Sequence, residues 1–179
     1  SGGEGMAIGR TFQESLQKAI RGLETGRDGL NPIFNEEDEF ETLKQKISIP
    51  SPDRLWYVAD GFRKGLTVEE IFDYSKIDPW FLVQIKDLID DEIEIQKIEL
   101  PDLSYEELYE LKRKGFSDSR IASLTGTSEE EVRRKRAELK IKPVFKRVDT
   151  CAAEFESSTA YMYSTCLLYT SPSPRDFTE

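Results

Sequence analysis

The chain has 179 residues, which is enough for one ordinary domain with parts of its neighbours. It carries 35 acidic and 25 basic side chains, so its formal charge of -10 opposes general binding to nucleic acid or to an anionic membrane. It has no histidine, which removes the commonest general base, the commonest zinc ligand and every Ser-His or Cys-His nucleophile pair.

No apolar run approaches the ~20 residues that are needed to cross a bilayer, and the first residues lack the layout of a signal peptide. The only cysteines are Cys151 and Cys166, which do not make a disulfide framework. Cys151 is interpreted as a buried, inert thiol, because its neighbours are small and apolar and no histidine can activate it. We expect a cytoplasmic protein with no membrane and no nucleic-acid partner.

The first predicted elements are a short strand at residues 5–9 and a helix. Thr11 and Glu14 have the spacing of a capping box, and apolar residues then recur at helical intervals. These apolar residues are Phe12, Leu16, Ala19, Ile20 and Leu23. Residues 25–32 are rich in Gly, Asp and Asn, so we interpret them as a linker and place a domain boundary near residue 26.

Residues 35–140 are predicted to be helical almost throughout. Asn35 is the predicted cap of a helix with an acidic first turn at residues 36–38. Ser51, in a Ser-Pro pair, is the predicted cap of the next helix, and Gly65 is its predicted C-terminal residue.

Further caps and apolar stripes follow along the same region. Capping-box spacing recurs in the pairs Thr67/Glu70, Ser104/Glu107 and Ser128/Glu131. Asp78-Pro79 begins the longest predicted helix, whose apolar face holds Leu82, Ile85, Ile89 and Ile93. The sequence therefore predicts a mainly α fold of several short, packed helices.

The pattern changes after Pro143. Residues 144–148 and 161–163 favour extended structure. Residues 166–179 are rich in Ser and Pro and lack apolar periodicity, which is typical of a disordered tail.

Two patterns resemble ligand sites and are interpreted structurally. Gly3, Gly5 and Gly9 miss the dinucleotide-binding spacing, and no Gly-Lys-Ser/Thr phosphate loop is present. An acidic cluster lacks the alternating ligands and central glycine of a calcium loop, and we expect it to spread over the solvent side of a helix. Its members are Asp87, Asp90, Asp91, Glu92 and Glu94. The sequence therefore predicts no catalytic, cofactor-binding or metal-binding residue.

Residues 117–136 carry the strongest alternative signal, since two short helices around Gly126 are typical of a DNA-binding helix-turn-helix. The second helix begins with three glutamates at 129–131, which phosphates repel, and its basic residues 133–136 suit a helix C-terminus. A structural hairpin is favoured, with a small DNA-binding protein and a free-standing helical adaptor as alternatives. The aromatic residues Trp56, Trp80 and Tyr109 fit either a core or contact anchors.

Four stretches closely resemble the middle of the large subunit of carbamoyl phosphate synthetase, namely residues 3–24, 56–60, 78–85 and 146–165. The resemblance implies that residues 1–26 end the first ATP-grasp (carboxyphosphate) half and that residues 27–165 are the helical oligomerisation domain. Because the resemblance stops at Cys166, residues 166–179 are expected to be a non-native tail.

The resemblance also implies what the parent enzyme does. Such a ligase makes carbamoyl phosphate from bicarbonate, glutamine-derived ammonia and ATP, with Mg (or Mn), for arginine and pyrimidine synthesis. Its implied partners are a glutaminase small subunit and other large subunits. The chain is then expected to be an inactive fragment without a cofactor of its own, which holds the two ATP-grasp halves in register.

Overall fold

The computed structural model describes residues 6–23, 25–148 and 161–166, and the side chains as far as Lys142. Its elements in chain order are α1 (Phe12–Gly22), α2 (Phe40–Ser48), α3 (Arg54–Arg63), α4 (Val68–Ser75), α5 (Pro79–Ile95), the 3-10 turn η1 (Leu100–Asp102), α6 (Tyr105–Arg113), α7 (Asp118–Thr125), α8 (Glu129–Glu138), β1 (Pro143–Val148) and β2 (Tyr161–Cys166). The predicted mainly α fold is confirmed.

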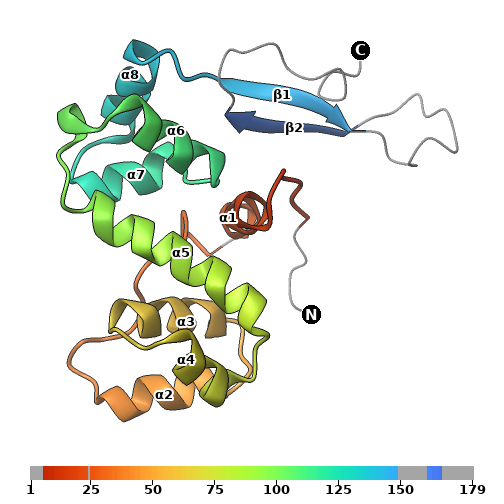
Figure 1. Cartoon of the computed structure of the whole chain (residues 1–179), viewed down its shortest axis with the longest axis vertical. Helices are drawn as coiled ribbons and strands as arrows, with labels where there is room; N and C mark the ends of the chain where they lie inside the picture. Colours follow the sequence, from red (N-terminus) through yellow and green to blue (C-terminus); the bar gives the residue numbers. More distant parts are fainter. Residues whose placement is uncertain (1–5, 24, 149–160, 167–179) are drawn as a thin grey trace, which may run out of the picture.

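Helix α5 is the longest element and runs between two helix groups (Figure 1). Helices α2, α3 and α4 pack together at one end of it, while α6, α7 and α8 lie at the other (Figure 1). Helix α1 packs against α5 between these groups, and one core of buried side chains runs through both. The fully buried aliphatic side chains include Leu43, Ile47, Ile71, Leu82, Ile89, Leu108, Ile121 and Val132.

The two helix groups share one local plan, which the sequence analysis did not detect. In each, a helix ends at a glycine with a left-handed backbone, Gly65 at φ 94° and Gly115 at φ 93°. A capped short helix follows, α4 or α7, and it ends in a second left-handed residue, Lys76 or Gly126. The equivalent positions keep a constant spacing along the chain, so the domain is built from a repeated helical unit.

Side-chain caps explain where many of the helices begin. Thr67, Ser104 and Ser128 each form the predicted capping box with a glutamate three residues later. The Thr11 hydroxyl accepts a hydrogen bond from the Glu14 N–H at 3.2 Å. Gly65 ends α3 as predicted, where the Leu66 N–H donates to the Gly61 carbonyl at 3.0 Å.

Two predicted helix starts were wrong. Asn35 accepts a hydrogen bond from the Glu37 N–H at 3.1 Å and so closes a local turn, and α2 begins only at Phe40. An Asn side chain can accept a hydrogen bond from the backbone N–H two residues later, and this turn competes with helix capping. The helix predicted to follow Ser51 begins at Arg54, with Asp53 as its N-cap residue.

The strand prediction was wrong near the start of the chain and was confirmed towards its end. The predicted strand at residues 5–9 is wrong for residues 6–9, which form no regular element. A strand needs a hydrogen-bonded neighbour, and the described part of the chain provides none there. Strands β1 and β2 confirm the extended prediction at the other end, and they pair antiparallel from Pro143↔Cys166 to Val148↔Tyr161. Cys166 therefore belongs to a strand, while Cys151 and residues 167–179 lie outside the described residues.

Candidate functional site

A deeply buried carboxylate joins the two helix groups. Glu92 of α5 is only 3 % exposed. Its Oε2 accepts from Arg63 Nη2 of the first group at 2.6 Å, and its Oε1 accepts from Arg120 Nε of the second group at 2.8 Å. The prediction that Glu92 shares a solvated acidic face was therefore wrong. The helical phase of Leu88, Ile89 and Ile95 already places position 92 on the core face.

The segment predicted as a linker, residues 25–32, is bound to α3. The Trp56 indole N–H donates to the Gly29 carbonyl at 3.0 Å, and the Arg27 guanidinium lies 4.5 Å from the centre of the Trp56 ring. The Asp60 carboxylate accepts hydrogen bonds from the backbone N–H groups of Ile33 and Phe34, which follow this segment, at 3.0 and 2.9 Å. Trp56 is thus a core residue.

Lys114, after α6, joins α6 to two carboxylates of α5. Its Nζ lies 2.9 Å from Asp87 and 2.6 Å from Asp91. Burial favours protonated Asp87, but hydrogen bonds from Lys114 and Gln13 outweigh it and lower the pKa of Asp87. Burial dominates at Asp91 and raises the pKa of that carboxyl. The pKa of Lys114 is raised, because its two carboxylate partners outweigh its own burial.

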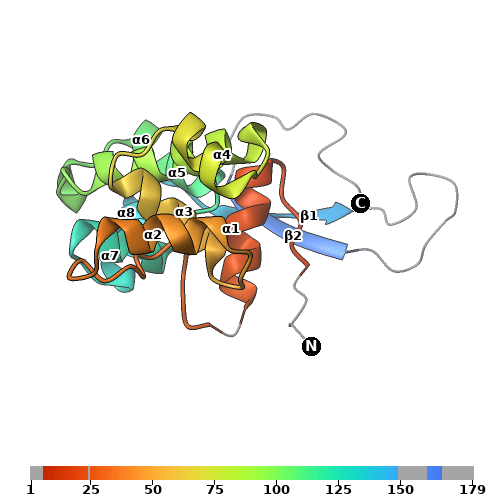
Figure 2. The same cartoon turned by 90° about the horizontal axis from the view of Figure 1, so that it is seen from below.

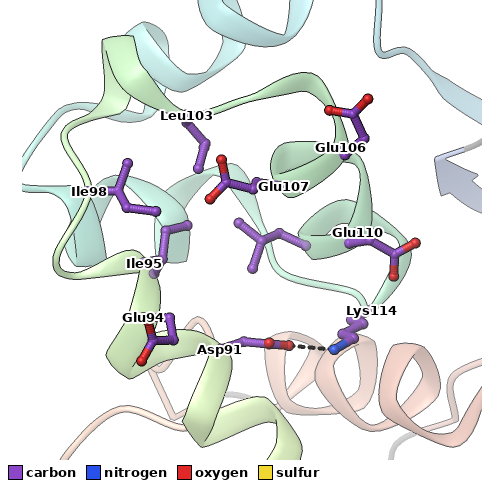
Figure 3. Close-up of a pocket in the computed structure, with 10 residues that line it drawn as sticks. Asp91, Glu94, Ile95, Ile98, Leu103, Glu106, Glu107, Glu110 and Lys114 are labelled. Atoms are coloured by element: carbon purple, nitrogen blue, oxygen red, sulfur yellow. Dashed lines mark hydrogen bonds and ion pairs between the residues drawn. The ribbon is translucent and has the colours of Figure 1, made fainter.

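A groove of about 350 Å³ opens between α5, α6 and the segment that joins them (Figure 3). Its floor is apolar and its rim is acidic. The floor residues are Ile95, Ile98, Leu103 and Leu111, and the rim residues include Glu94, Glu106, Glu107 and Glu110. Such a surface suits an apolar side chain with a positive charge nearby. Across residues 6–23, 25–148 and 161–166, no group of three or more His, Cys, Asp or Glu is placed to hold a metal ion.

A second candidate surface is aromatic. The rings of Phe12, Trp80 and Phe81 pack edge to face where α1 and α5 begin, with centroid distances of 5.0 to 5.3 Å. Trp80 is 52 % exposed, so of the three aromatic residues singled out in the sequence it is the one available as a contact anchor. Tyr109 is partly buried and stacks on Tyr105.

The α7–α8 hairpin does not present its basic residues as a DNA-binding surface. Arg136 of α8 makes two hydrogen bonds to Asp118 of α7, at 2.9 and 2.6 Å. Lys135 donates to the Pro101 carbonyl, and Arg133 pairs with Glu129 on the same helix. Arg136 therefore joins α8 to α7, and Lys135 joins α8 to η1, two contacts that were not predicted but that suit a structural hairpin.

In the part of the chain that the structure describes, no helix is both long and apolar enough to cross a membrane. Among the side chains that the structure describes, the exposed large hydrophobic ones are Met6, Phe40, Ile49, Trp80, Phe81 and Val83.

Comparison with known proteins gives one consistent family. Residues 4–140 match the family model for the oligomerisation domain of the carbamoyl-phosphate synthetase large chain. The carbamoyl phosphate synthase large chain of Pasteurella multocida is 59 % identical over 163 residues, and that of Pseudomonas aeruginosa is 55 % identical over 165 residues. Each match covers 91 % of this chain and 15 % of the relative, so the chain spans a small part of the length of these proteins.

Proposed function

The chain belongs to the carbamoyl-phosphate synthetase large-chain family, within its oligomerisation domain, and we propose that it serves there as a rigid helical scaffold. In this role it holds two ATP-grasp halves of a full-length large chain in register and contributes to the association of large chains. The parent protein is a ligase that uses ATP. A DNA-binding or free-standing adaptor role is not favoured, because the family match takes in the hairpin at residues 117–136 together with the rest of the helical unit.

The observation that carries the proposal is the Glu92 bridge. A helix that spans two groups fixes their separation only if neither group can rotate about it. Glu92 forms a charge-assisted hydrogen bond to one arginine from each group, and both bonds are shielded from water. The continuous apolar core adds to this restraint, so the described helices form one stiff body.

Several finer features of the parent are part of the same proposal. We infer that the ATP-grasp halves use ATP with Mg (or Mn) to phosphorylate bicarbonate and then carbamate. Ammonia comes from a glutaminase small subunit, and the assembly works in the cytoplasm. Residues 1–26 then end the first half and residues 27–165 form the oligomerisation domain, although α1 packs tightly on α5. No residue of this segment handles the phosphates.

The scaffold role is tested in a full-length large chain. In the Pasteurella multocida protein, the 163 matching residues are replaced by those of this chain, and the resulting protein is called the graft. Glu92→Ala in this graft should leave bicarbonate-dependent ATP hydrolysis of the first half nearly intact while lowering the formation of carbamoyl phosphate. The reason is that a loosened scaffold misplaces the halves without touching their chemistry. Equal loss of both activities, or loss of neither, would refute the scaffold role.

A further inference from the structure

The strongest feature that the scaffold role does not use is the aromatic cluster, formed by Phe12, Trp80 and Phe81. Trp80 is 52 % and Phe81 41 % exposed. Val83, 50 % exposed, lies one helical turn after Trp80 and extends the same surface. Exposed aromatic rings that already pack on one another are typical of the centre of an interface. The cluster therefore needs an apolar partner.

The cluster lies where the polypeptide enters the domain. Phe12 is the first residue of α1, and both other rings belong to the first turn of α5. Met6, in the segment that leads into α1, is 77 % exposed. Figure 2 shows this segment running beside α1 and away from the helix groups. Polypeptide that arrives through this segment is thereby tethered next to the cluster.

The size of the surface favours a tethered partner over a second copy of the chain. An aromatic side chain buries about 150–250 Å² in total, so these half-exposed residues offer a few hundred Å² together. A stable interface between separate molecules buries roughly 800 Å² on each partner. Association of free molecules also costs translational and rotational entropy, whereas a short linker supplies a local concentration on the order of millimolar.

We propose that the aromatic cluster is the docking surface for the polypeptide that directly precedes this segment in a full-length large chain. The occupant is an apolar patch of that preceding polypeptide. This proposal rests on the proposed function, in which the segment lies between two larger portions of one chain. The match to only 15 % of each relative's length shows that such chains carry extensive polypeptide outside this segment.

Hydroxyl-radical footprinting with mass spectrometry tests the proposal, because the radical oxidises exposed aromatic side chains. The 179-residue chain is compared with the full-length graft described above. Oxidation of Trp80 and Phe81 should fall at least about fivefold in the graft, since a docked partner removes most of their exposed area. Phe40, which is also 41 % exposed but lies on α2, is the matched control and should not change. Trp56, 3 % exposed, should stay unoxidised in both proteins and thereby reports that each is folded.

Equal oxidation of Trp80 and Phe81 in the two proteins would overturn the proposal. So would protection of these residues in the 179-residue chain as its concentration rises, because a second copy would then be the occupant. A graft that makes carbamoyl phosphate with Trp80 still exposed would overturn the docking surface and leave the scaffold role standing.

A second experiment uses the 179-residue chain alone. Trp80→Ser in the 179-residue chain should shift the melting temperature by less than about 3 °C, because an interface residue contributes little to the fold of its own domain. Unfolding of this variant would show that the cluster is part of the core, and the proposal would fail.

Discussion

Glu92 lies between two arginines, so replacing it leaves the buried Arg120 without the anion that Glu92 supplies, while Arg63 keeps its ion pair with Asp60. We predict that Glu92→Gln lowers the free energy of unfolding by about 3 kcal/mol, because breaking a buried ion pair on one side leaves an uncompensated charge. Glu94→Gln is the matched control. The Glu94 side chain is 71 % exposed and pairs with Lys97 at the surface, so its loss should cost less than about 0.5 kcal/mol. Urea unfolding of both variants measures the difference. Similar losses for the two would contradict the bridge.

Asp118 gives the fold a dependence on acid pH. Burial favours its protonated form, but the hydrogen bond from Arg136 and the charge of Lys112 outweigh burial and lower the pKa of Asp118. The folded-state pKa thus lies below the unfolded value of about 3.9, so the carboxylate stabilises the fold at neutral pH. That contribution is lost as the pH falls through the folded-state pKa.

We therefore predict that Asp118→Asn lowers the free energy of unfolding by about 2 kcal/mol at pH 7. The gap between the variant and the unchanged chain should begin to narrow below the unfolded-state pKa of about 4 and should close only as the pH falls through the lower folded-state pKa of Asp118. Urea unfolding at a series of pH values measures the gap. A gap that stays constant with pH would mean that the charge of Asp118 does not stabilise the fold.

The role of a residue could be predicted from the sequence where it depends on residues that are close by in the chain. The caps at Thr67, Ser104 and Ser128 follow from a side chain that reaches its own backbone three residues on. The environment of Glu92 was not predicted, because Arg63 and Arg120 come from distant parts of the chain. An acidic residue that falls on the same helix face as buried aliphatic residues indicates a buried carboxylate, and this pattern can be recognised in the sequence.

At the scale of elements, the repeated glycine offers a controlled comparison. Gly65 and Gly115 have the same left-handed backbone, but a Cβ at Gly65 meets open space, while one at Gly115 would lie 2.9 Å from the Glu14 Cα of α1. We predict that Gly65→Ala costs about 1 kcal/mol from backbone strain alone. Gly115→Ala should cost more, since it adds a clash with the backbone of α1.

Hydrogen exchange distinguishes these two effects. Amides of α1 should exchange faster in Gly115→Ala than in Gly65→Ala, because only the first substitution pushes α1 away from the turn that follows α6. Unchanged protection of α1 in Gly115→Ala would show that α1 does not depend on close approach at this position.

The same scale shows where element boundaries could be predicted. The longest helix was placed correctly from Asp78-Pro79, since the Asp78 carboxylate accepts from the Trp80 N–H at 2.8 Å and proline suits the first helical turn. The helix starts predicted at Asn35 and Ser51 were wrong, because the residue types that cap helices are also common in turns. The strand at residues 6–9 failed for a non-local reason, as pairing requires a neighbour that the helical unit does not provide.

For the whole molecule, the resemblance found in the sequence placed the chain in the right family, and periodicity alone placed it in the right fold class. Neither showed that the two helix groups share one plan around α5, although Arg-Lys-Gly recurs at residues 63–65 and 113–115. Most other equivalent positions share a structural role, such as a cap or a left-handed backbone, rather than the same amino acid. The predicted boundary near residue 26 stays a prediction. The interior of the described part is mainly apolar and includes buried ion pairs such as Glu92 with Arg120, which suits a domain that positions other domains.

We propose that this segment positions the two ATP-grasp halves and does not itself bind nucleotide. Calorimetric titration of the 179-residue chain with magnesium-ATP and bicarbonate, followed by a phosphate-release assay on the same samples, tests it most directly. The full-length Pasteurella multocida relative serves as the positive control. The account predicts no saturable heat and no ATP hydrolysis above a mock-purified blank. Saturable, magnesium-dependent binding of ATP to the chain would contradict it.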